Sequence, residues 1–292
     1  MPSLFIDPNA EAEYNEDENK TVLDMIHDIN HRDIQNLCLT VWEKMQSPDS
    51  TEFIKDFMEK GTLISQHNNR AFISSQMFPI YGNLYVYSKN NKIMKVVNCT
   101  CDQPLAEFDV IKEIAMQQYA TSLQSRCSFN VPTIREYGKF LLDNNDLQSN
   151  FTFNCLYYFT MDKIDAKTLQ DYIQSIDLDN TCTPLVKKIN SIHNCLIDNN
   201  LHHNDYHVEN IMVDANNNIN VIDYGLATET PTMIEEDEPY NCDKLNAIKK
   251  TAKTKNKGGR RKKTKKTKRK ARKLRGYIPF NPFFKGKVQG KL

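Results

Sequence analysis

The sequence contains no uninterrupted apolar run close to the roughly 18 residues that a membrane-spanning helix requires. Its start, Met1-Pro-Ser-Leu-Phe-Ile-Asp-Pro8, lacks the basic and apolar regions of a secretory signal peptide. These absences argue against a membrane-spanning or secreted protein, so the sequence predicts an intracellular protein, cytoplasmic or nuclear, with no membrane partner. Hydrophobic residues make up 39% of the 292 residues, which is ample for a buried core.

Acidic residues are absent after Asp243, and this absence divides the chain into two oppositely charged parts. Residues 244–292 hold 21 of the 38 Lys and Arg residues, whereas all 37 Asp and Glu residues precede them. The first part therefore has a formal charge of −20 (17 basic against 37 acidic residues) and the last part +21, although the whole chain has only +1. Such a separation is typical of an acidic body with a tail that binds a polyanion or docks on the body.

Residues 249–276 contain almost only Lys, Arg, Thr, Gly and Ala, which cannot form a core. They are predicted to be a disordered Lys/Arg-rich tail. We expect residues 249–275 to bind nucleic acid or another polyanion, with nuclear import, docking on the acidic body or simple solubilisation as alternatives. Residues 277–292 form a separate, apolar C-terminal segment.

The eight cysteines lack the regular spacing of a disulfide framework. Cys99 and Cys101 have neither the spacing of a zinc ribbon nor that of a redox motif. The sequence therefore predicts reduced thiols, with Cys99 and Cys101 as small buried hydrophobic side chains.

Residues 1–60 are interpreted as an acidic N-terminal helical extension. Residues 1–19 are acidic and polar, and apolar residues then recur at helical spacing from Lys20 to Pro48. Asp49 and Glu52 resemble a capping box that opens a further helix, and Gly61 closes it. We expect these helices to brace the part that follows, the alternative being a helix that binds a partner.

The pattern then becomes that of a sheet. Strands are predicted over 71–74, 82–87, 93–97, 131–137 and 151–159, which together give five antiparallel strands. Lys95 lies in an otherwise apolar strand, where an unpaired ammonium group would be costly, so it needs an acidic partner. The helix predicted over about 104–123 offers Glu107 and Glu113.

Residues 201–228 carry the most informative pattern in the chain. Two short apolar runs, 211–213 and 219–222, flank an Asn-rich turn and predict a β-hairpin. Asp205 and Asn210 precede this hairpin and Asp223 follows it, so two carboxylates and one amide can converge. Such a group suits Mg²⁺ held by few protein oxygens together with substrate phosphates.

These residues resemble the motifs of protein kinases. His203-Asn-Asp-Tyr-His-Val-Glu-Asn210 resembles the catalytic loop H-R-D-L-K-x-x-N, and Asp223-Tyr-Gly225 resembles D-F-G. The resemblance implies that Asp205 is the catalytic base and that Asn210 and Asp223 hold Mg²⁺. Two residues depart from the pattern: Asn204 replaces an Arg that commonly pairs with a phosphorylated activation loop, and His207 replaces a catalytic Lys.

The resemblance extends upstream, so that it covers about residues 75–228. Ile93-Met94-Lys95 resembles V-A-I-K, and Glu113 is then preferred over Glu107 as the partner of Lys95. Gly82 resembles the last glycine of the Gly-rich loop, while Met77 and Pro79 occupy the places of the other two. Residues 161–164 resemble the hinge, which implies that Met161 is the gatekeeper and that the backbone of Asp162 and Ile164 binds adenine.

The implied fold class is α+β, a two-lobed protein-kinase-like fold. Its five-stranded antiparallel N-lobe would span 61–163 and its reduced helical C-lobe 164–248. No A-P-E motif follows Gly225, so the chain resembles reduced, atypical kinases such as the RIO type. It also resembles predicted kinases of large DNA viruses that end in basic tails, which adds a virus particle to the expected locations.

The function implied is that of an ATP- and Mg²⁺-dependent Ser/Thr protein kinase acting on a protein substrate, most simply a basic one. Catalysis would involve Asp205, Lys95 and His207. Two alternatives stay open: a small-molecule phosphotransferase of the aminoglycoside or choline kinase type, favoured by His207 and by the missing A-P-E, and a pseudokinase with a nucleic-acid-binding tail. The intact set of Asp205, Asn210 and Asp223 argues against the pseudokinase.

Overall fold

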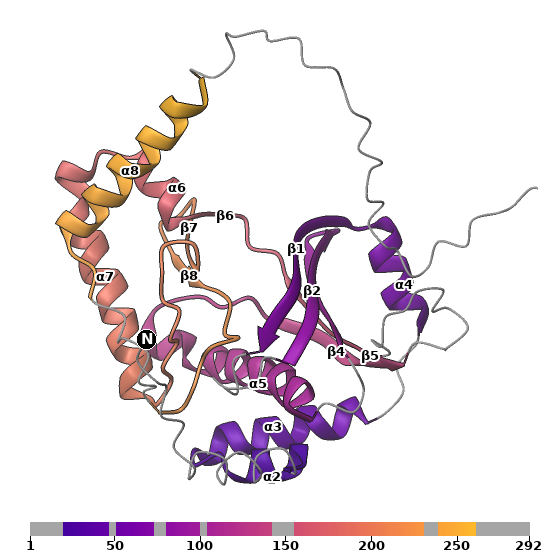
Figure 1. Ribbon diagram of the computed structural model, residues 1–292. Helices are drawn as coiled ribbons and strands as arrows, with labels where there is room; N and C mark the ends of the chain where they lie inside the picture. Colours follow the sequence, from indigo (N-terminus) through magenta and orange to yellow (C-terminus); the bar gives the residue numbers. More distant parts are fainter. Residues whose placement is uncertain are drawn as a thin grey trace, which may run out of the picture.

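The computed structural model describes residues 20–46, 51–72, 80–99, 104–141, 155–230 and 239–260 (Figure 1). The acidic start (1–19), the expected cap at Asp49, and Met77 and Pro79 lie outside the described residues, as does everything after Arg260. In the part of the chain that is described, no helix is both long enough and apolar enough to cross a membrane.

A five-stranded antiparallel sheet forms the centre of the fold, as predicted from the sequence. The strand order is β1-β2-β3-β5-β4. Asn90 and Asn91 form the turn between the second and third strands, both with positive φ (47° and 59°), which Asn tolerates better than most residues. The strands are β1 (Thr62–Phe72), β2 (Ile80–Lys89), β3 (Lys92–Cys99), β4 (Ile134–Leu141) and β5 (Cys155–Asp162).

The first strand begins earlier than predicted. The sequence pattern placed its start at Ala71, but β1 starts at Thr62, directly after Gly61. Its register against β2 shifts between Leu63 and Ser65 and again between His67 and Arg70. Such irregularities break the alternation of apolar and polar residues on which strand prediction depends.

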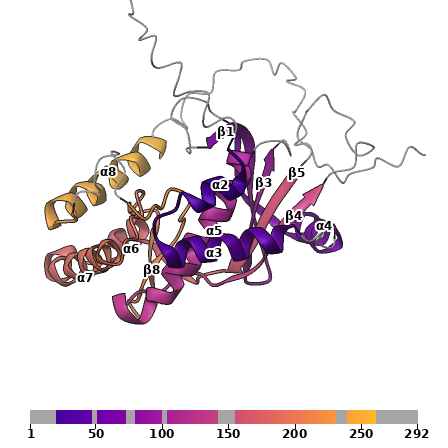
Figure 2. The same ribbon diagram turned by 90° about the horizontal axis from the view of Figure 1, so that it is seen from below.

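Helices cover both faces of this sheet, so β3 and β5 are buried on both sides (Figure 2). Val97, Tyr157 and Phe159 belong to the core shared with α5 (Pro104–Cys127). On the other face, Ile54 and Phe57 of α4 (Thr51–Lys60) pack with a set of strand residues: Met94, Val96, Leu156 and Tyr158.

Local signals in the sequence explain where the N-terminal helices begin and end. α2 (Val22–His27) opens with a capping box in which Thr21 and Asp24 each accept the other's backbone N–H. α3 (Arg32–Met45) buries Ile34 and Val41 in the core that contains α5. α4 ends where the Gly61 N–H donates to the Phe57 carbonyl oxygen. A side chain at position 61 would not fit, because its Cβ would lie only 2.4 Å from this oxygen.

The remaining described residues form a helical part around a small sheet of order β6-β7-β8. The predicted hairpin is present as β7 (Ile211–Asp214) and β8 (Ile219–Val221), and β6 (Ala166–Thr168) adds a strand too short for its pattern to be noticed. The helices are α6 (Leu169–Ser175), α7 (Leu178–Asp198) and α8 (Cys242–Arg260). α7 starts before the predicted Pro184 because Asp177 caps it by accepting the Asp179 N–H.

The predicted disordered tail from residue 249 is wrong in its first part, because α8 continues to Arg260. Asn241 caps this helix by accepting the Lys244 N–H at 2.7 Å, and Leu245 is fully buried. Lys249 donates to the Ile176 carbonyl at 2.5 Å. Lys and Ala are good helix formers, so an anchored first turn is enough to extend the helix into the basic run.

The prediction of reduced thiols is confirmed for Cys38 and Cys99, which are free and buried, but it is wrong for five other cysteines. Cys127 at the end of α5 is bonded to Cys195 of α7, and Cys182 of α7 to Cys242 of α8. Cys155 is likewise disulfide-bonded. The bonded pairs are 68 and 60 residues apart in the sequence, a separation at which spacing cannot indicate pairing.

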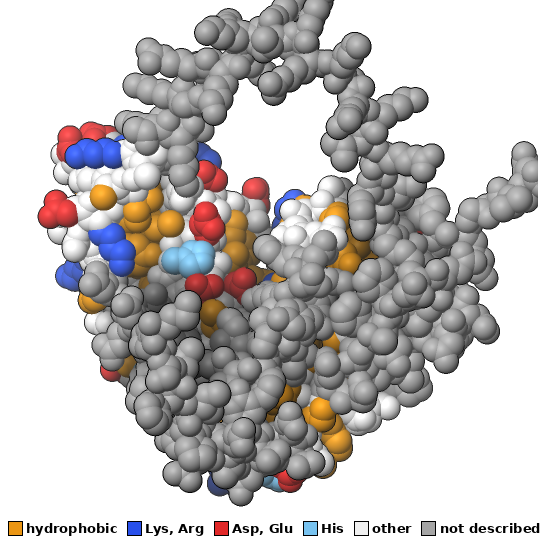
Figure 3. Space-filling view, viewed as in Figure 1, with side chains coloured by type: hydrophobic (Ala, Val, Ile, Leu, Met, Phe, Trp, Pro, Cys, Tyr) orange, Lys and Arg blue, Asp and Glu red, His pale blue; other side chains and the backbone are white. Residues whose placement is uncertain are grey.

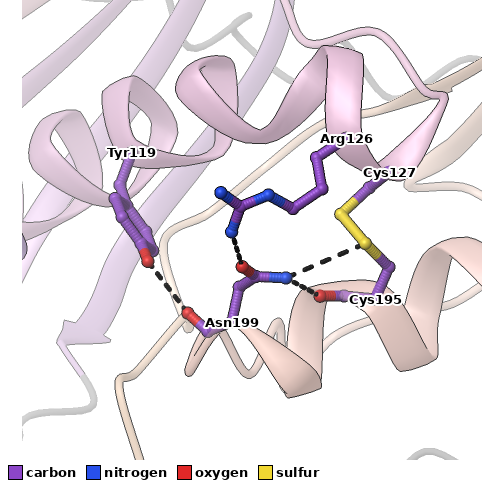
Figure 4. The surroundings of a disulfide bond; sticks show 5 residues. All are labelled: Tyr119, Arg126, Cys127, Cys195 and Asn199. Carbon is purple, nitrogen blue, oxygen red and sulfur yellow. Dashed lines mark hydrogen bonds between the residues drawn. A yellow bond between two sulfur atoms is a disulfide. The ribbon is translucent and has the colours of Figure 1, made fainter.

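Hydrogen bonds surround the Cys127–Cys195 disulfide (Figure 4). The Tyr119 hydroxyl donates to the Asn199 carbonyl at 3.0 Å, and the Arg126 guanidinium donates to the Asn199 side-chain oxygen. The Asn199 amide in turn donates to the Cys195 carbonyl at 2.7 Å. α5, which packs on the five-stranded sheet, is therefore fixed to the end of α7 by a covalent bond and by polar contacts.

Candidate active site

Lys95 of β3 forms a buried ion pair with α5. Its Nζ lies 2.5 Å from Glu113 Oε1, and Lys95 itself is only 9% exposed. The other candidate, Glu107, instead accepts from the Tyr157 hydroxyl at 2.9 Å and from Lys139 Nζ at 2.8 Å. Of the two acidic residues considered from the sequence, Glu113 is therefore the one that meets Lys95.

Lys95 also reaches across to the hairpin. Its Nζ lies 2.7 Å from Asp223 Oδ1, so a single ammonium group joins α5 to the segment after β8. Burial acts to lower the pKa of Lys95, but the carboxylates of Asp223 and Glu113 outweigh it and raise this pKa above its usual value. Lys95 is consequently a fixed positive charge.

Asp223 is held in a backbone conformation that few side chains adopt. Its φ is +66°, and Gly225 follows so closely against α5 that a Cβ there would lie 3.4 Å from Glu113 Oε2. The ring of Tyr224 is fully buried, with its centroid 4.9 Å from that of His203. A left-handed Asp is strained unless its surroundings hold it, and such strain often occurs at functional sites.

The loop before the hairpin brings Asp205 and Asn210 together. Asn210 Nδ2 donates to Asp205 Oδ2 at 2.8 Å and to the Asp205 carbonyl at 3.1 Å. The Ile222 N–H donates to the Asn210 carbonyl at 3.0 Å. Asn210 and Asp223 therefore lie at adjacent ends of the two hairpin strands. Three of the residues expected at a metal-dependent site thus lie on two adjoining loops.

His207 lies in the same loop and is exposed. Its Nδ1 accepts the Glu209 N–H at 3.1 Å, and its Nε2 lies 3.3 Å from Asp205 Oδ1. With Nδ1 as acceptor, the neutral ring carries its proton on Nε2 and directs it to Asp205. The structure therefore connects His207 to the Asp205 carboxylate directly.

A pocket of about 780 Å³ opens beside these residues, between the five-stranded sheet and the hairpin. Its volume falls within the range typical of small-ligand sites. Lys95 and Asp223 lie at its polar end. The apolar lining comes from both sides, with Leu84, Val86 and Ile93 from the sheet and Met212 and Ile222 from the hairpin.

The three residues expected at the hinge also line this pocket: Met161, Asp162 and Ile164. Met161 lies opposite Ile93 in the ladder and is 7% exposed. The Asp162 N–H donates to the Thr133 carbonyl at 3.1 Å, so this N–H is already used within the protein. Gly82, expected at the Gly-rich loop, lies in β2, where it is paired with Arg70.

Two polar contacts at the pocket were not anticipated from the sequence. Gln117, one helical turn after Glu113, is buried and donates to the Pro132 carbonyl at 2.7 Å, and its Nε2 lies 3.7 Å from Met161 Sδ. Arg135 binds the Asp162 carboxylate through two nitrogens, at 2.9 and 2.5 Å, which lowers the pKa of Asp162. The i, i+4 spacing from Glu113 was the only sequence signal for Gln117.

The donor set at the polar end suits Mg²⁺. Asp223 offers carboxylate oxygens and Asn210 an amide oxygen, the hard ligands that this ion prefers. Within the described ranges, no group of three or more His, Cys, Asp or Glu side chains is arranged to hold a metal ion. With one carboxylate and one amide as donors, Asp223 and Asn210 would leave the remaining ligand positions of such an ion to phosphates and water, as Mg²⁺ commonly does.

Similarity to known proteins is found among solved structures and not among family models or curated sequences. No protein-family model matches the chain, and no curated protein sequence matches it. Among solved structures, the Cydia pomonella granulovirus kinase PK-1 is similar over 68% of each chain, with 17% sequence identity and a TM-score of 0.34. The described part of this chain has a mixed α/β architecture with a five-stranded antiparallel sheet.

Proposed function

We propose that this protein is an ATP-dependent kinase with a two-lobed kinase fold that transfers the γ-phosphate to Ser or Thr hydroxyls of a protein. The observation that carries the proposal is that Lys95, at the polar end of the pocket, binds both Glu113 and Asp223. The loop that carries the Asp205–Asn210 pair adjoins the Asp223 segment through the Ile222–Asn210 backbone hydrogen bond. Burying an ammonium group, here shared between two carboxylates, beside an apolar pocket is costly, so its presence there indicates a functional role.

Each of these side chains has a separate role in the proposed phosphate transfer. Lys95, fixed by Glu113, would bind the nucleotide phosphates, and Asp223 with Asn210 would hold Mg²⁺, which neutralises charge on those phosphates when bound. Asp205 would accept or orient the proton of the acceptor hydroxyl. The carbonyl of Asp162 and the backbone of Ile164 would bind the adenine edge below Met161. Most of the rate would come from positioning and charge neutralisation.

The acceptor is proposed to be a basic protein. On the face seen in Figure 3, acidic side chains lie around an exposed histidine, and the body as a whole carries the excess of acidic residues. Opposite charge favours encounter with a basic acceptor. A small-molecule acceptor is the second candidate, favoured by the exposed His207 beside Asp205.

The test is phosphate transfer from labelled ATP with Mg²⁺ to a panel of acceptors. Basic proteins such as histones should be labelled at Ser or Thr, and acidic proteins of similar size should not. Labelling of an aminoglycoside or choline, without labelling of any protein, would favour the second candidate. Absence of transfer to every acceptor, by protein that binds the nucleotide, would instead support the pseudokinase.

We also propose that the basic residues from 249 onwards bind a polyanion such as nucleic acid. Because α8 packs on the body, the informative truncation ends the chain at Arg260, which removes 14 of the 21 basic residues after Asp243 without cutting the helix. Salt-sensitive binding to DNA or RNA should be lost in this truncation. A truncation after Gly276, which removes only the apolar segment and three Lys residues, should largely keep it.

For location, we propose the virus particle among the settings expected from the sequence. Disulfides persist on virions and are rare in the reducing cytoplasm and nucleus, and this chain contains the Cys127–Cys195 and Cys182–Cys242 bonds. Thiol labelling of the native protein, isolated without reductant, should leave these four cysteines unlabelled. Full labelling of all four would instead favour the cytoplasm or nucleus.

A further inference from the structure

The segment after Asp223, residues 224–230, is tied back to the Asp205 loop by its backbone. The His202 N–H donates to the Thr228 carbonyl at 2.8 Å, and the Thr228 N–H donates to the His202 carbonyl at 2.9 Å. Within the segment, the Ala227 N–H donates to the Tyr224 carbonyl at 3.0 Å. The two loops that carry Asp205 and Asp223 therefore share a short antiparallel bridge.

The side chain of Asn204 reinforces this bridge from the position next to Asp205. Its Nδ2 donates to the Leu226 carbonyl at 2.9 Å and to Thr228 Oγ1 at 2.7 Å, so both amide hydrogens are used. The Thr228 hydroxyl gives its own proton to the Thr230 carbonyl at 2.6 Å and can only accept from Asn204. The site thus requires two donors from position 204.

The backbone at Asn204 is also unusual. Its φ is +57°, in the left-handed region that Asn and Gly enter more readily than other residues. This backbone conformation and the two donated hydrogen bonds are independent requirements, and Asn meets both. None of the groups in the link is ionised, so the two loops are held together by neutral hydrogen bonds alone.

We propose that Asn204 is a positioning residue that holds the segment 224–230 against the Asp205 loop and thereby fixes Asp223 relative to Asp205 with no phosphorylated residue in that segment. The proposal rests on the proposed kinase function for its effect on catalysis. The structural link itself can be tested without any activity.

The competing explanation is that Asn204 serves only to adopt the positive φ. Asn204→Gly keeps the backbone freedom and removes the amide, while Asn204→Asp keeps the size and replaces both donors by acceptors. Asn90→Gly is the matched control, because Asn90 also has a positive φ (47°) but lies in the β2–β3 turn. If φ alone matters, Asn204→Gly and Asn90→Gly will behave alike.

Hydrogen exchange of the full chain without nucleotide measures the link directly. Peptides that report the Ala227 and Thr228 amides should exchange about tenfold faster or more in Asn204→Gly and Asn204→Asp, since each loses the hydrogen bonds that restrain the segment. Asn90→Gly should exchange there as the wild type does. Unchanged exchange in both Asn204 variants would overturn the proposal.

Kinetics and dephosphorylation test the catalytic consequence. Both Asn204 variants should lose about 10- to 100-fold in kcat through misplaced carboxylates, with KM for ATP within about threefold, because the base-binding wall is untouched. Wild-type activity should survive treatment with a broad phosphatase. Loss of activity after this treatment would overturn the proposal that the link works with no phosphorylated residue. If the wild type transfers no phosphate while exchange behaves as expected, the proposed function fails and the positioning link stands.

Discussion

The Nζ of Lys95 and the Oδ1 of Asp223 lie 2.7 Å apart, although 128 residues separate them in the sequence. Lys95 belongs to the five-stranded sheet and Asp223 follows the hairpin, so this contact exists only while both parts of the chain keep their relative positions. Since Glu113 binds the same ammonium group, α5 shares this dependence. We therefore expect removal of the Lys95, Glu113 or Asp223 side chain to change the geometry of the whole pocket.

The two carboxylates near the pocket should be essential in different ways. Asp205→Asn removes the base and should lower kcat by about 10²–10⁴-fold. Asp223→Asn removes a metal ligand and one partner of Lys95, and should lower kcat by at least about 10²–10³-fold. Both variants should unfold near the wild-type temperature, because Lys95 keeps Glu113 in each.

The matched control for these variants is Asp214→Asn. Asp214 lies at the end of β7, where its carboxylate accepts the Asn216 and Asn218 N–H groups in the hairpin turn. It does not line the pocket. Activity should stay within about threefold of wild type. Full turnover in a well-folded Asp223→Asn protein would contradict the kinase assignment.

Tyr224 and Tyr157 should respond oppositely to replacement by Phe. The Tyr224 hydroxyl is buried and meets no hydrogen-bond partner in the described part of the chain, so Tyr224→Phe should raise the free energy of unfolding by about 1–3 kcal/mol. The Tyr157 hydroxyl donates to Glu107, so Tyr157→Phe should lower it by about 1–3 kcal/mol. Urea unfolding measures both, and equal signs would show that the Tyr224 hydroxyl is satisfied.

The same two tyrosines predict a loss of stability in alkali. Burial, and after it the Glu107 carboxylate, raises the pKa of Tyr157, and burial raises the pKa of Tyr224 well above its usual value. Above about pH 10 the unfolded chain releases these protons while the folded chain keeps them. The stabilisation is therefore complete below pH ~10 and falls as pH rises, by up to about 1.4 kcal/mol per pH unit for each group.

The double variant Tyr157→Phe/Tyr224→Phe isolates this effect. Unfolding free energies measured between pH 8 and 11 should decline less steeply in the double variant than in the wild type. Parallel curves would assign the alkaline decline to other groups.

The Cys127–Cys195 disulfide should contribute about 4 kcal/mol to stability. The estimate follows from the loop of 68 residues that it closes in the unfolded chain. A variant with Ala at both positions should be less stable than the wild type by this amount in oxidising buffer. The difference should nearly vanish in dithiothreitol, where neither protein has the bond, and a difference that persists would be due to packing instead.

His207 should contribute to loop order through its side-chain contacts. Its Nδ1 accepts the Glu209 N–H at 3.1 Å, and its Nε2 lies 3.3 Å from Asp205 Oδ1. His207→Gln, which also offers an acceptor and a donor, should lower kcat by no more than about tenfold and keep the shape of the kcat–pH profile. An alkaline limb present in the wild type and flattened in His207→Lys would show that the imidazolium acts in the transition state.

The sequence was sufficient for features that depend on neighbouring residues. The hairpin followed from two apolar runs around Asn216–Asn218, and the need of Lys95 for an acidic partner followed from its apolar strand. The five antiparallel strands were also anticipated. In each case a short stretch carries both the backbone preference and the chemistry.

Features made by distant residues were not predictable in this way. The pairing of Cys127 with Cys195 depends on how α5 and α7 pack, and no local pattern encodes it. β1 was obscured by its two register shifts, and α8 extends into the basic run because its first turns are anchored on the body. In the sequence, Asn204 was only a departure from the catalytic-loop motif. Its two hydrogen bonds depend on the fold, which places residues 226–228 beside it.

The disulfide at the end of α5 has a mechanical consequence for the pocket. The chain passes from β5 to β6 through residues 163–165, and Cys127–Cys195 is a second covalent link between the sheet side and the helical side. Two fixed attachments define an axis, so the walls of the pocket can separate only by rotating about the line that joins them. β1 is the edge strand of the sheet and lines the pocket through Ile64, which is 56% exposed. We therefore expect a nucleotide to enter and leave beneath β1.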